Sequence, residues 1–113
     1  MLEIQTTHLR LDVVVLEITG RIKIGREGKQ LEGAVDSLVS GEWKKVIFDL
    51  TGVTHIDSTG IRIIVMSAGQ VKRAGGELRL AGANGHVEQA LKMTRVDQIV
   101  GLHPTTVAAA TGF

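Results

Sequence analysis

The hydroxyl pair Ser58 and Thr59 is the strongest candidate for chemistry in this sequence. It lies in the run Asp57-Ser58-Thr59-Gly60, between an apolar segment and an amphipathic one. Serine and threonine before a helix most often serve only as its N-cap. A hydroxyl at a helix start also lies beside free backbone N–H groups and the positive end of the helix dipole, where a phosphate is stabilised. The residues alone leave both interpretations open, a cap and a phosphorylation site.

The two neighbours of the hydroxyl pair would shape such a site. Asp57 places a carboxylate beside Ser58, where it could hold the hydroxyl, contact a partner or shape the loop. Gly60 has no side chain, so we expect that a partner can approach the backbone closely there.

Other kinds of site are disfavoured by the spacing of their residues. The four histidines, His8, His55, His86 and His103, lack metal-ligand spacing, so no metal site is expected. A phospho-aspartate receiver domain would need an acidic pair after the first strand, but "VVVLEITG" ends in glycine. The segment "GREGKQ" lacks the ending of a phosphate-binding P-loop, and Ser58 lacks the G-x-S-x-G frame of a hydrolase nucleophile.

The composition predicts one soluble domain that spans residues 1–113. The formal net charge is +1, and the chain has one Trp, two Phe and no Tyr, so neither a basic nucleic-acid face nor an aromatic stacking platform is expected. The chain has no cysteine, which excludes disulfides and thiolate chemistry. No apolar run approaches the roughly 20 residues that span a bilayer. We expect a cytoplasmic protein without a cofactor, a nucleic-acid partner or direct membrane insertion.

Periodic apolar residues predict the strands and helices that position the candidate site. The predicted order is a strand at 2–5, a strand at 13–18, a helix at 27–39, a strand at 45–50, a loop, a helix ending at Gly75, a strand at 77–82, a helix at 85–93, a short strand at 98–102 and a helix after Pro104. Alternating strands and helices favour parallel pairs, and the N-terminal hairpin makes the sheet mixed. The fold class is therefore α/β, with a mixed sheet of four to five strands and about four packed helices. Met66 and Met93 are expected in the core.

The segment "VIFDLTGVTHIDSTGIRIIVMSAGQVKRAGGELRLAG" resembles a STAS domain of the anti-sigma factor antagonist family. The matching features are a buried strand that ends in Asp-Leu, the pattern V-x-x-I-D-S-T-G-I, an amphipathic helix and the strand "GGELRLAG". "ITGRI" and "VEQALKMTRVDQIVGL" resemble the family's segments before the first helix and at the end of the domain. The resemblance covers nearly the whole chain and implies the STAS fold.

The resemblance also implies a phosphorylation switch rather than an enzyme. Family members are phosphorylated on the first hydroxyl after the aspartate, which is Ser58 here. The kinase is a serine/threonine kinase that is also the anti-sigma factor; it binds the unphosphorylated antagonist, and a metal-dependent serine phosphatase reverses the modification. A phosphate adds about −1.5 to −2 charges beside Asp57, which would weaken the complex. The implied partner surface consists of Asp57, Ser58, Thr59, Gly60, Arg62, Arg21 and Lys23.

Two features depart from the family pattern. Arg62 occupies a position where many members have glycine, and a cation there could pair with a phosphate on Ser58. The segment 21–30 is more basic than the family's usual acidic stretch. Two other functions stay open: a scaffolding STAS subunit, in a stress-signalling assembly or in a lipid or anion transporter, and a nucleotide-binding STAS domain.

Overall fold

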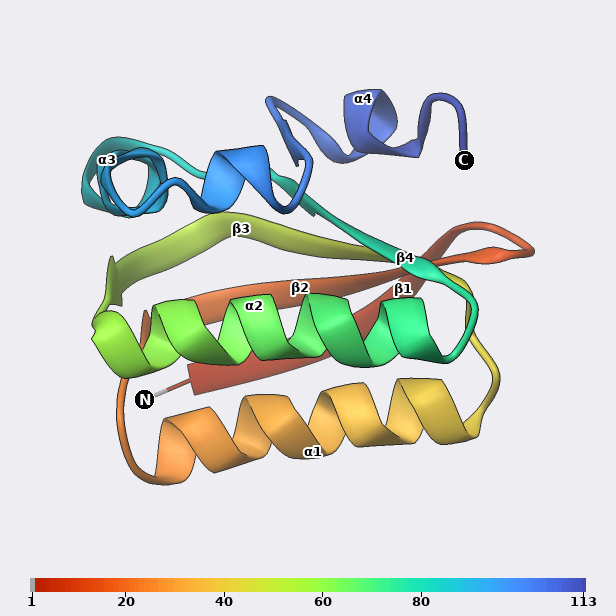
Figure 1. Ribbon diagram of the computed structural model, residues 1–113, viewed down its shortest axis with the longest axis horizontal. Coiled ribbons are helices and arrows are strands. Elements are labelled where there is room, and N and C mark those ends of the chain that lie inside the picture. Colours follow the sequence, from red (N-terminus) through yellow and green to blue (C-terminus); the bar gives the residue numbers. More distant parts are fainter. Residues whose placement is uncertain (1) are drawn as a thin grey trace.

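The computed structural model describes residues 2–113 and contains a five-stranded sheet with helices on both of its faces. Along the chain the elements are β1 (Leu2–Arg10), β2 (Val13–Ile22), α1 (Arg26–Ser40), β3 (Lys45–Ile56), α2 (Ser58–Arg73), β4 (Glu77–Ala81), α3 (Gly85–Met93), a 3₁₀ turn (Val96–Gln98), β5 (Leu102–His103) and α4 (Thr106–Ala110). The strand order follows the sequence, from β1 to β5 (Figure 1). β1 and β2 pair antiparallel, and each later pair is parallel. The predicted mixed α/β fold is confirmed.

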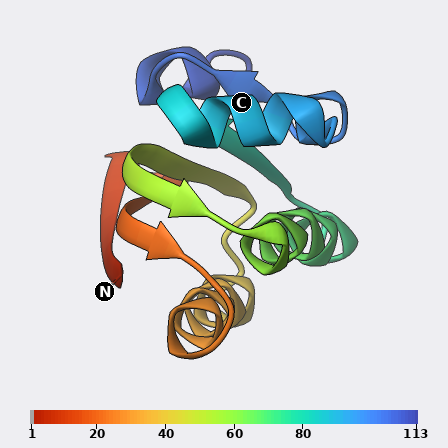
Figure 2. The same ribbon diagram turned by 90° about the vertical axis from the view of Figure 1, so that its left-hand side faces the viewer.

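The central strands are buried on both faces because each face is covered by its own pair of helices. Helices α1 and α2 lie on one face of the sheet, and α3 and α4 lie on the other (Figures 1 and 2). In β3, Val46, Phe48 and Leu50 belong to the larger core cluster, whereas Ile47 belongs to a smaller one that includes Ala109 of α4. Alternate residues of the strand therefore fill opposite layers, which explains why residues 46–48 are all apolar instead of alternating with polar residues.

Helix α2 is buried along a wider stripe than its periodicity predicts. Ile64 and Val71 lie seven residues apart on one face of the helix and are buried, but Ile63 and Ser67 are buried too. Helix α2 packs against α1 as well as against the sheet, and Gly28 of α1 allows the two helices to approach closely. A Cβ placed on Gly28 of α1 would lie 2.8 Å from the Ile63 Cδ1 atom.

Several predicted boundaries and positions are wrong. The first strand continues to Arg10, β2 continues to Ile22, and β3 runs through the expected loop to Ile56. The segment 98–102 is not a strand, because the left-handed Arg95 starts a 3₁₀ turn and only Leu102 and His103 pair with β4. Its apolar residue Val100 is buried by that turn rather than by strand pairing.

Met66 and Met93, which were expected in the core, are 58% and 78% exposed. Each lies on the outward side of an amphipathic helix, where neither the sheet nor another helix covers it. Helix α3 faces the sheet with Val87 and Leu91, which are buried, whereas Gln89 and Lys92 are exposed.

The position of β3 at the centre of the sheet predicts a large loss of stability when its core is truncated. Phe48 is fully buried, so Phe48→Ala should lower the free energy of unfolding by about 3–5 kcal/mol in urea denaturation. Leu11 is 98% exposed at the tip of the β1–β2 hairpin, so Leu11→Ala should change it by less than about 0.5 kcal/mol. Equal effects of the two substitutions would contradict the assigned core.

Candidate functional site

The candidate site lies where β3 passes directly into α2. Asp57 alone separates the last residue of β3, Ile56, from the first residue of α2, Ser58. The backbone of Asp57 is extended, and its carboxylate accepts a 2.8 Å hydrogen bond from the Gly60 N–H group. Asp57 is therefore the N-cap of α2. The interpretation of Ser58 or Thr59 as the cap is wrong, because both hydroxyls lie inside the first turn.

The second carboxylate oxygen of Asp57 holds a different segment of the chain. It accepts a 3.0 Å hydrogen bond from the Ile24 N–H group, in the turn between β2 and α1. The Asp57 N–H group donates to the Ile22 carbonyl oxygen at 3.2 Å. Asp57 thereby joins the end of β2, the turn after it and the start of α2.

The environment of Asp57 favours its ionised form. Burial raises the pKa of the carboxyl, but hydrogen bonds from the backbone N–H groups of Gly60, Ile24 and Thr59, together with the charge of Lys23, outweigh burial and lower that pKa. A carboxylate that accepts several backbone N–H bonds is expected to behave in this way. Asp57 is thus a negatively charged structural group at neutral pH.

Gly60 is needed by the protein's own packing. It is buried, and a Cβ placed on it would lie 2.5 Å from the Ile22 carbonyl oxygen and 2.8 Å from the Ile56 Cγ1 atom. Ile22 and Ile56 are neighbours in the parallel pair of β2 and β3. The expectation that Gly60 leaves room for a partner is wrong, because the strand ends fill that room.

Ser58 is the exposed group of this constellation. Among residues 2–113, the Ser58 side chain has no hydrogen-bond partner, since Asp57 supplies the cap. Arg62 is also exposed and follows Ser58 by one helical turn, so the two residues lie on the same face of α2. Thr59 is half-buried and lines a groove of about 270 Å³ that it shares with Arg62.

The remaining predicted site residues lie at the same end of the molecule. Arg21 is exposed near the end of β2 and is paired in register with His55 of β3. Lys23 is half-buried and close enough to Asp57 to influence its pKa. Figure 2 views this end, where β2 and β3 point toward the starts of α1 and α2. All seven predicted residues are brought together, and their role in binding a partner stays a prediction.

Sequence reasoning missed two apolar residues beside the site. Ile24 is 73% exposed in the turn before α1, and Met66 is 58% exposed on α2. Both line the groove that contains Thr59 and Arg62. Ile24 could have been noticed, because it is an apolar residue between Lys23 and Gly25, outside the strand predicted at 13–18 and the helix predicted at 27–39.

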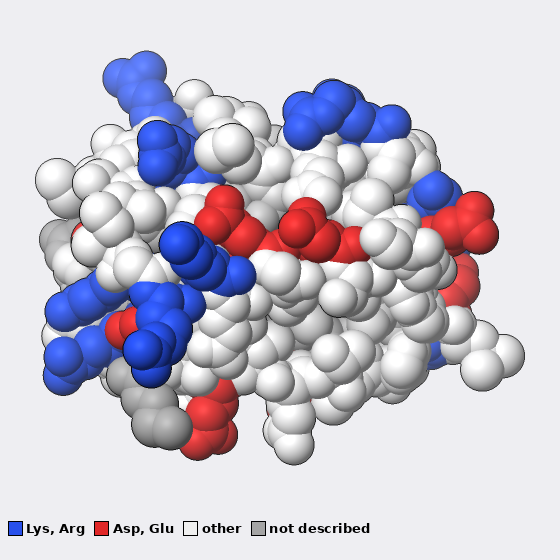
Figure 3. Space-filling model, turned by 90° about the horizontal axis from the view of Figure 1, so that it is seen from below, with Lys and Arg blue, Asp and Glu red and all other residues white. Residues whose placement is uncertain are grey.

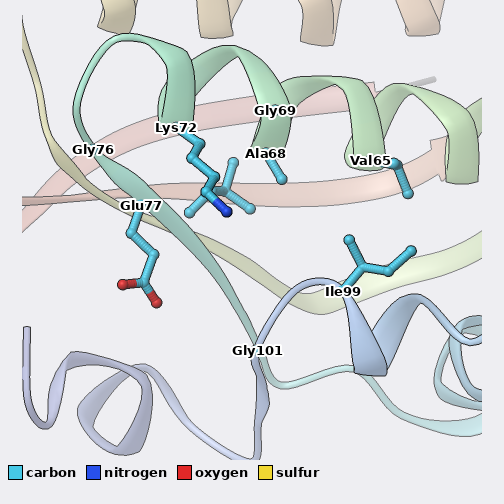
Figure 4. A pocket seen from close by; sticks show the side chains of 9 residues that line it. Val65, Ala68, Gly69, Lys72, Gly76, Glu77, Ile99 and Gly101 are labelled. Atoms are coloured by element: carbon cyan, nitrogen blue, oxygen red, sulfur yellow. The ribbon is translucent and has the colours of Figure 1, made fainter.

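A second, larger groove lies away from Ser58. Its volume is about 460 Å³, and it lies between the second half of α2, the start of β4 and the segment from Ile99 to Gly101 (Figure 4). Lys72 and Glu77 are its charged lining residues, and Ala68, Gly69 and Val65 contribute small or apolar surface. The groove is lined by no serine, threonine, cysteine or histidine, and none of the predicted site residues lines it.

Residues 2–113 contain neither a candidate metal site nor a candidate membrane-spanning helix. No group of three potential metal ligands occurs within this range, and the rings of His55 and His86, 6.0 Å apart, form only a pair. None of the helices in the same range is both long and apolar enough to cross a bilayer.

The comparison with protein families is consistent with this geometry. The sequence model of the STAS domain family matches residues 4–109, which is nearly the whole chain. The chain belongs to the STAS domain family. A Bordetella bronchiseptica protein named as a candidate anti-sigma factor antagonist, BtrV, is 24% identical over 104 residues, which cover 92% of this chain and 90% of that protein.

Solved structures of STAS proteins share the fold. A candidate anti-sigma factor antagonist from Thermotoga maritima has a TM-score of 0.84 at 25% identity, covering 94% of this chain and 90% of that one. The phosphorylated form of the Bacillus protein SpoIIAA has a TM-score of 0.72 at 12% identity, covering 95% and 96% of the two chains. The second likeness shows the fold alone.

The contact at Gly60 predicts different effects for two glycine substitutions in helices. Gly60→Ala forces a methyl group against the backbone of β2 and should lower the free energy of unfolding by about 1–3 kcal/mol. The control is Gly33→Ala in α1, where nothing lies within 4 Å of the new Cβ; it should be neutral or stabilising by about 0.5–1 kcal/mol. A tolerated Gly60→Ala would contradict the packing described at the start of α2.

The hydrogen bonds of Asp57 predict a pH-dependent contribution to stability. Asp57→Ala removes the cap and should cost about 1–2 kcal/mol at neutral pH. Because folding lowers the pKa of Asp57, its stabilisation is present above the pKa of an unfolded aspartate, about 3.9, and is lost as the pH falls through the lower folded value.

Urea denaturation of the wild type and Asp57→Ala from pH 7 to pH 2 measures this contribution. The difference between the two proteins should shrink below about pH 4. Glu32→Ala, on the exposed side of α1, is the control and should stay within about 0.5 kcal/mol of the wild type at neutral pH. A difference for Asp57→Ala that is constant with pH would exclude the ionised cap.

Proposed function

We propose that this protein is an anti-sigma factor antagonist that is switched by phosphorylation of Ser58. In its unphosphorylated form it binds an anti-sigma factor that is also a serine/threonine kinase, and so frees a sigma factor. The kinase transfers the γ-phosphoryl group of ATP to the Ser58 hydroxyl, and a metal-dependent serine phosphatase hydrolyses the phosphoserine. The protein is a binding module and a kinase substrate, not an enzyme.

The observation that carries this proposal is the free hydroxyl of Ser58. Because Asp57 caps α2, the Ser58 hydroxyl is not needed as the N-cap of the helix, and it is exposed. A kinase can therefore modify it without first breaking a hydrogen bond of the cap. Thr59 is a poorer acceptor, because its side chain is half-buried beside the groove.

The position of Ser58 also suits a switch that leaves the fold intact. A phosphate in the first turn of the sixteen-residue helix α2 lies at the positive end of its dipole, one turn from Arg62. The same phosphate lies beside the ionised Asp57 and adds negative charge to the partner surface. Charge and desolvation then weaken the complex. The names of the relatives, which describe anti-sigma factor antagonists, support this function.

The proposal predicts a specific pattern among three variants. Incubated with its anti-sigma factor kinase and ATP, the wild type should gain one phosphate, which mass spectrometry should locate on Ser58. Ser58→Ala should gain none but should still bind the kinase, because it loses only a free hydroxyl. Ser58→Asp should bind at least about tenfold more weakly, yet its melting temperature should hardly change, because an acid is favourable in the first turn of a helix.

Thr59→Ala is the matched control and should still be phosphorylated on Ser58. A phosphate located on Thr59, or a Ser58→Asp variant that binds as tightly as the wild type, would overturn the switch. The protein would then be better described as a scaffolding subunit.

A further inference from the structure

Positive charge that takes part in no ion pair within residues 2–113 gathers around Ser58. We call the residues concerned the cationic collar: Arg21, Lys23, Arg26, Lys29 and Arg62. Figure 3 shows Lys and Arg concentrated at the left end of this face, where α1 and α2 begin, with acidic residues along its middle. The ion pairs found within residues 2–113 lie elsewhere and join Lys45 to Asp12, Arg79 to Glu77 and Lys92 to Glu88.

The positive charge of the collar is local, because the chain as a whole is nearly neutral. The segment 21–30 contains four basic residues and a single acid, Glu27, whereas the whole protein has a formal net charge of +1. Glu32 is the acid among the residues that line the groove, and the carboxylate of Asp57 is occupied by backbone N–H groups. The field at this end therefore favours a negatively charged partner.

The groove inside the collar adds an apolar contact. Ile24 and Met66, both mostly exposed, line it, and Gly28 and Ile63 lie between them. Its volume of about 270 Å³ is below the roughly 300–1,000 Å³ of typical small-molecule pockets. It suits a protruding side chain of another protein better than a nucleotide or a similar ligand.

The distribution of aromatic residues argues against a nucleic acid as the occupant. Trp43 follows the far end of α1, Phe48 is buried in the core, and the Phe113 ring lies 3.8 Å from the Arg79 guanidinium carbon. None of the three can stack on a base at the collar. A partner that combines acidic groups with an apolar side chain matches both parts of the surface.

We propose that the cationic collar and its groove bind an acidic protein surface on which carboxylates surround one protruding apolar side chain. This inference rests on the proposed function and gives the chemistry of the partner in that switch. It also gives the phosphate a second effect. Arg62 and Lys23 lie near Ser58, so a phosphate there pairs with cations that the partner's carboxylates would otherwise use.

A synthetic helical peptide tests this chemistry without the natural partner. The peptide carries one leucine flanked by glutamates, and the control peptide carries lysines in place of the glutamates. Amide chemical shifts of the full chain should change within residues 21–32 and 58–66 on addition of the glutamate peptide only. The affinity should fall at least about tenfold between roughly 50 and 300 mM salt.

Charge reversal inside the collar and at the far end of α2 gives the decisive comparison. Arg62→Glu should raise the Kd of the glutamate peptide at least about tenfold, as should Lys29→Glu on α1. Arg73→Glu, at the far end of α2, should leave it within about twofold. Ser58→Asp should weaken binding as well. Circular dichroism establishes that each variant is folded before its affinity is compared.

Three results would overturn the inference: equal binding of the two peptides, shift changes mainly outside residues 21–32 and 58–66, or tighter binding to duplex DNA or phosphatidylglycerol vesicles at the same salt concentration. These failures differ from failure of the switch. Phosphorylation of Ser58 by the kinase can succeed while the peptide test fails, in which case only the acidic partner is excluded.

Discussion

The carboxylate of Asp57 is the constraint on which the rest of the site depends. One of its oxygens accepts from the Gly60 N–H group and starts α2, and the other accepts from the Ile24 N–H group and fixes the turn after β2. Both hydrogen bonds are directed at backbone groups, so the arrangement does not depend on the neighbouring hydroxyls. Ser58 is consequently left exposed in the first turn of the helix.

Packing beneath this cap explains why the start of α2 is rigidly placed. The ends of β2 and β3 are paired at Ile22 and Ile56, and both lie against Gly60, where even a methyl group would collide. The helix is thus held at its first turn by a hydrogen-bonded cap on one side and by close backbone contact on the other. A charge added to Ser58 can alter the surface while the elements beneath it keep their positions.

The spacing of apolar residues predicted most of the fold, because a strand buried on both faces of the sheet and a helix packed on the sheet each leave a distinct pattern in the sequence. The both-sided burial of β3 and the orientation of α3 follow directly from it. The pattern failed at residues 98–102, where a short apolar run packs as a turn, and at Ile63, where a second helix buries a side that the sheet does not reach. Tertiary neighbours of this kind cannot be inferred from the spacing within one helix.

The residues of the candidate site could be predicted in position but not in role. Arg21, Lys23 and Asp57 were expected on one partner surface because of the resemblance to the STAS family, and the parallel pairing of β2 with β3 places them at one edge of the sheet. Aspartate, serine and threonine are all good N-caps, and the sequence could not decide which of them caps α2. Met66 was assigned to the core because a methionine gives no indication of its exposure when it stands among apolar neighbours.

Carbon-13 NMR titration of the Asp57 carboxyl tests the central claim most directly, with the amide signals of Gly60 and Ile24 followed in the same samples. The account predicts that the carboxyl titrates below the ordinary aspartate value of about 3.9 and that both amide signals move with the same midpoint. An Asp57 pKa at or above the ordinary value, with amide signals that do not follow it, would contradict the account.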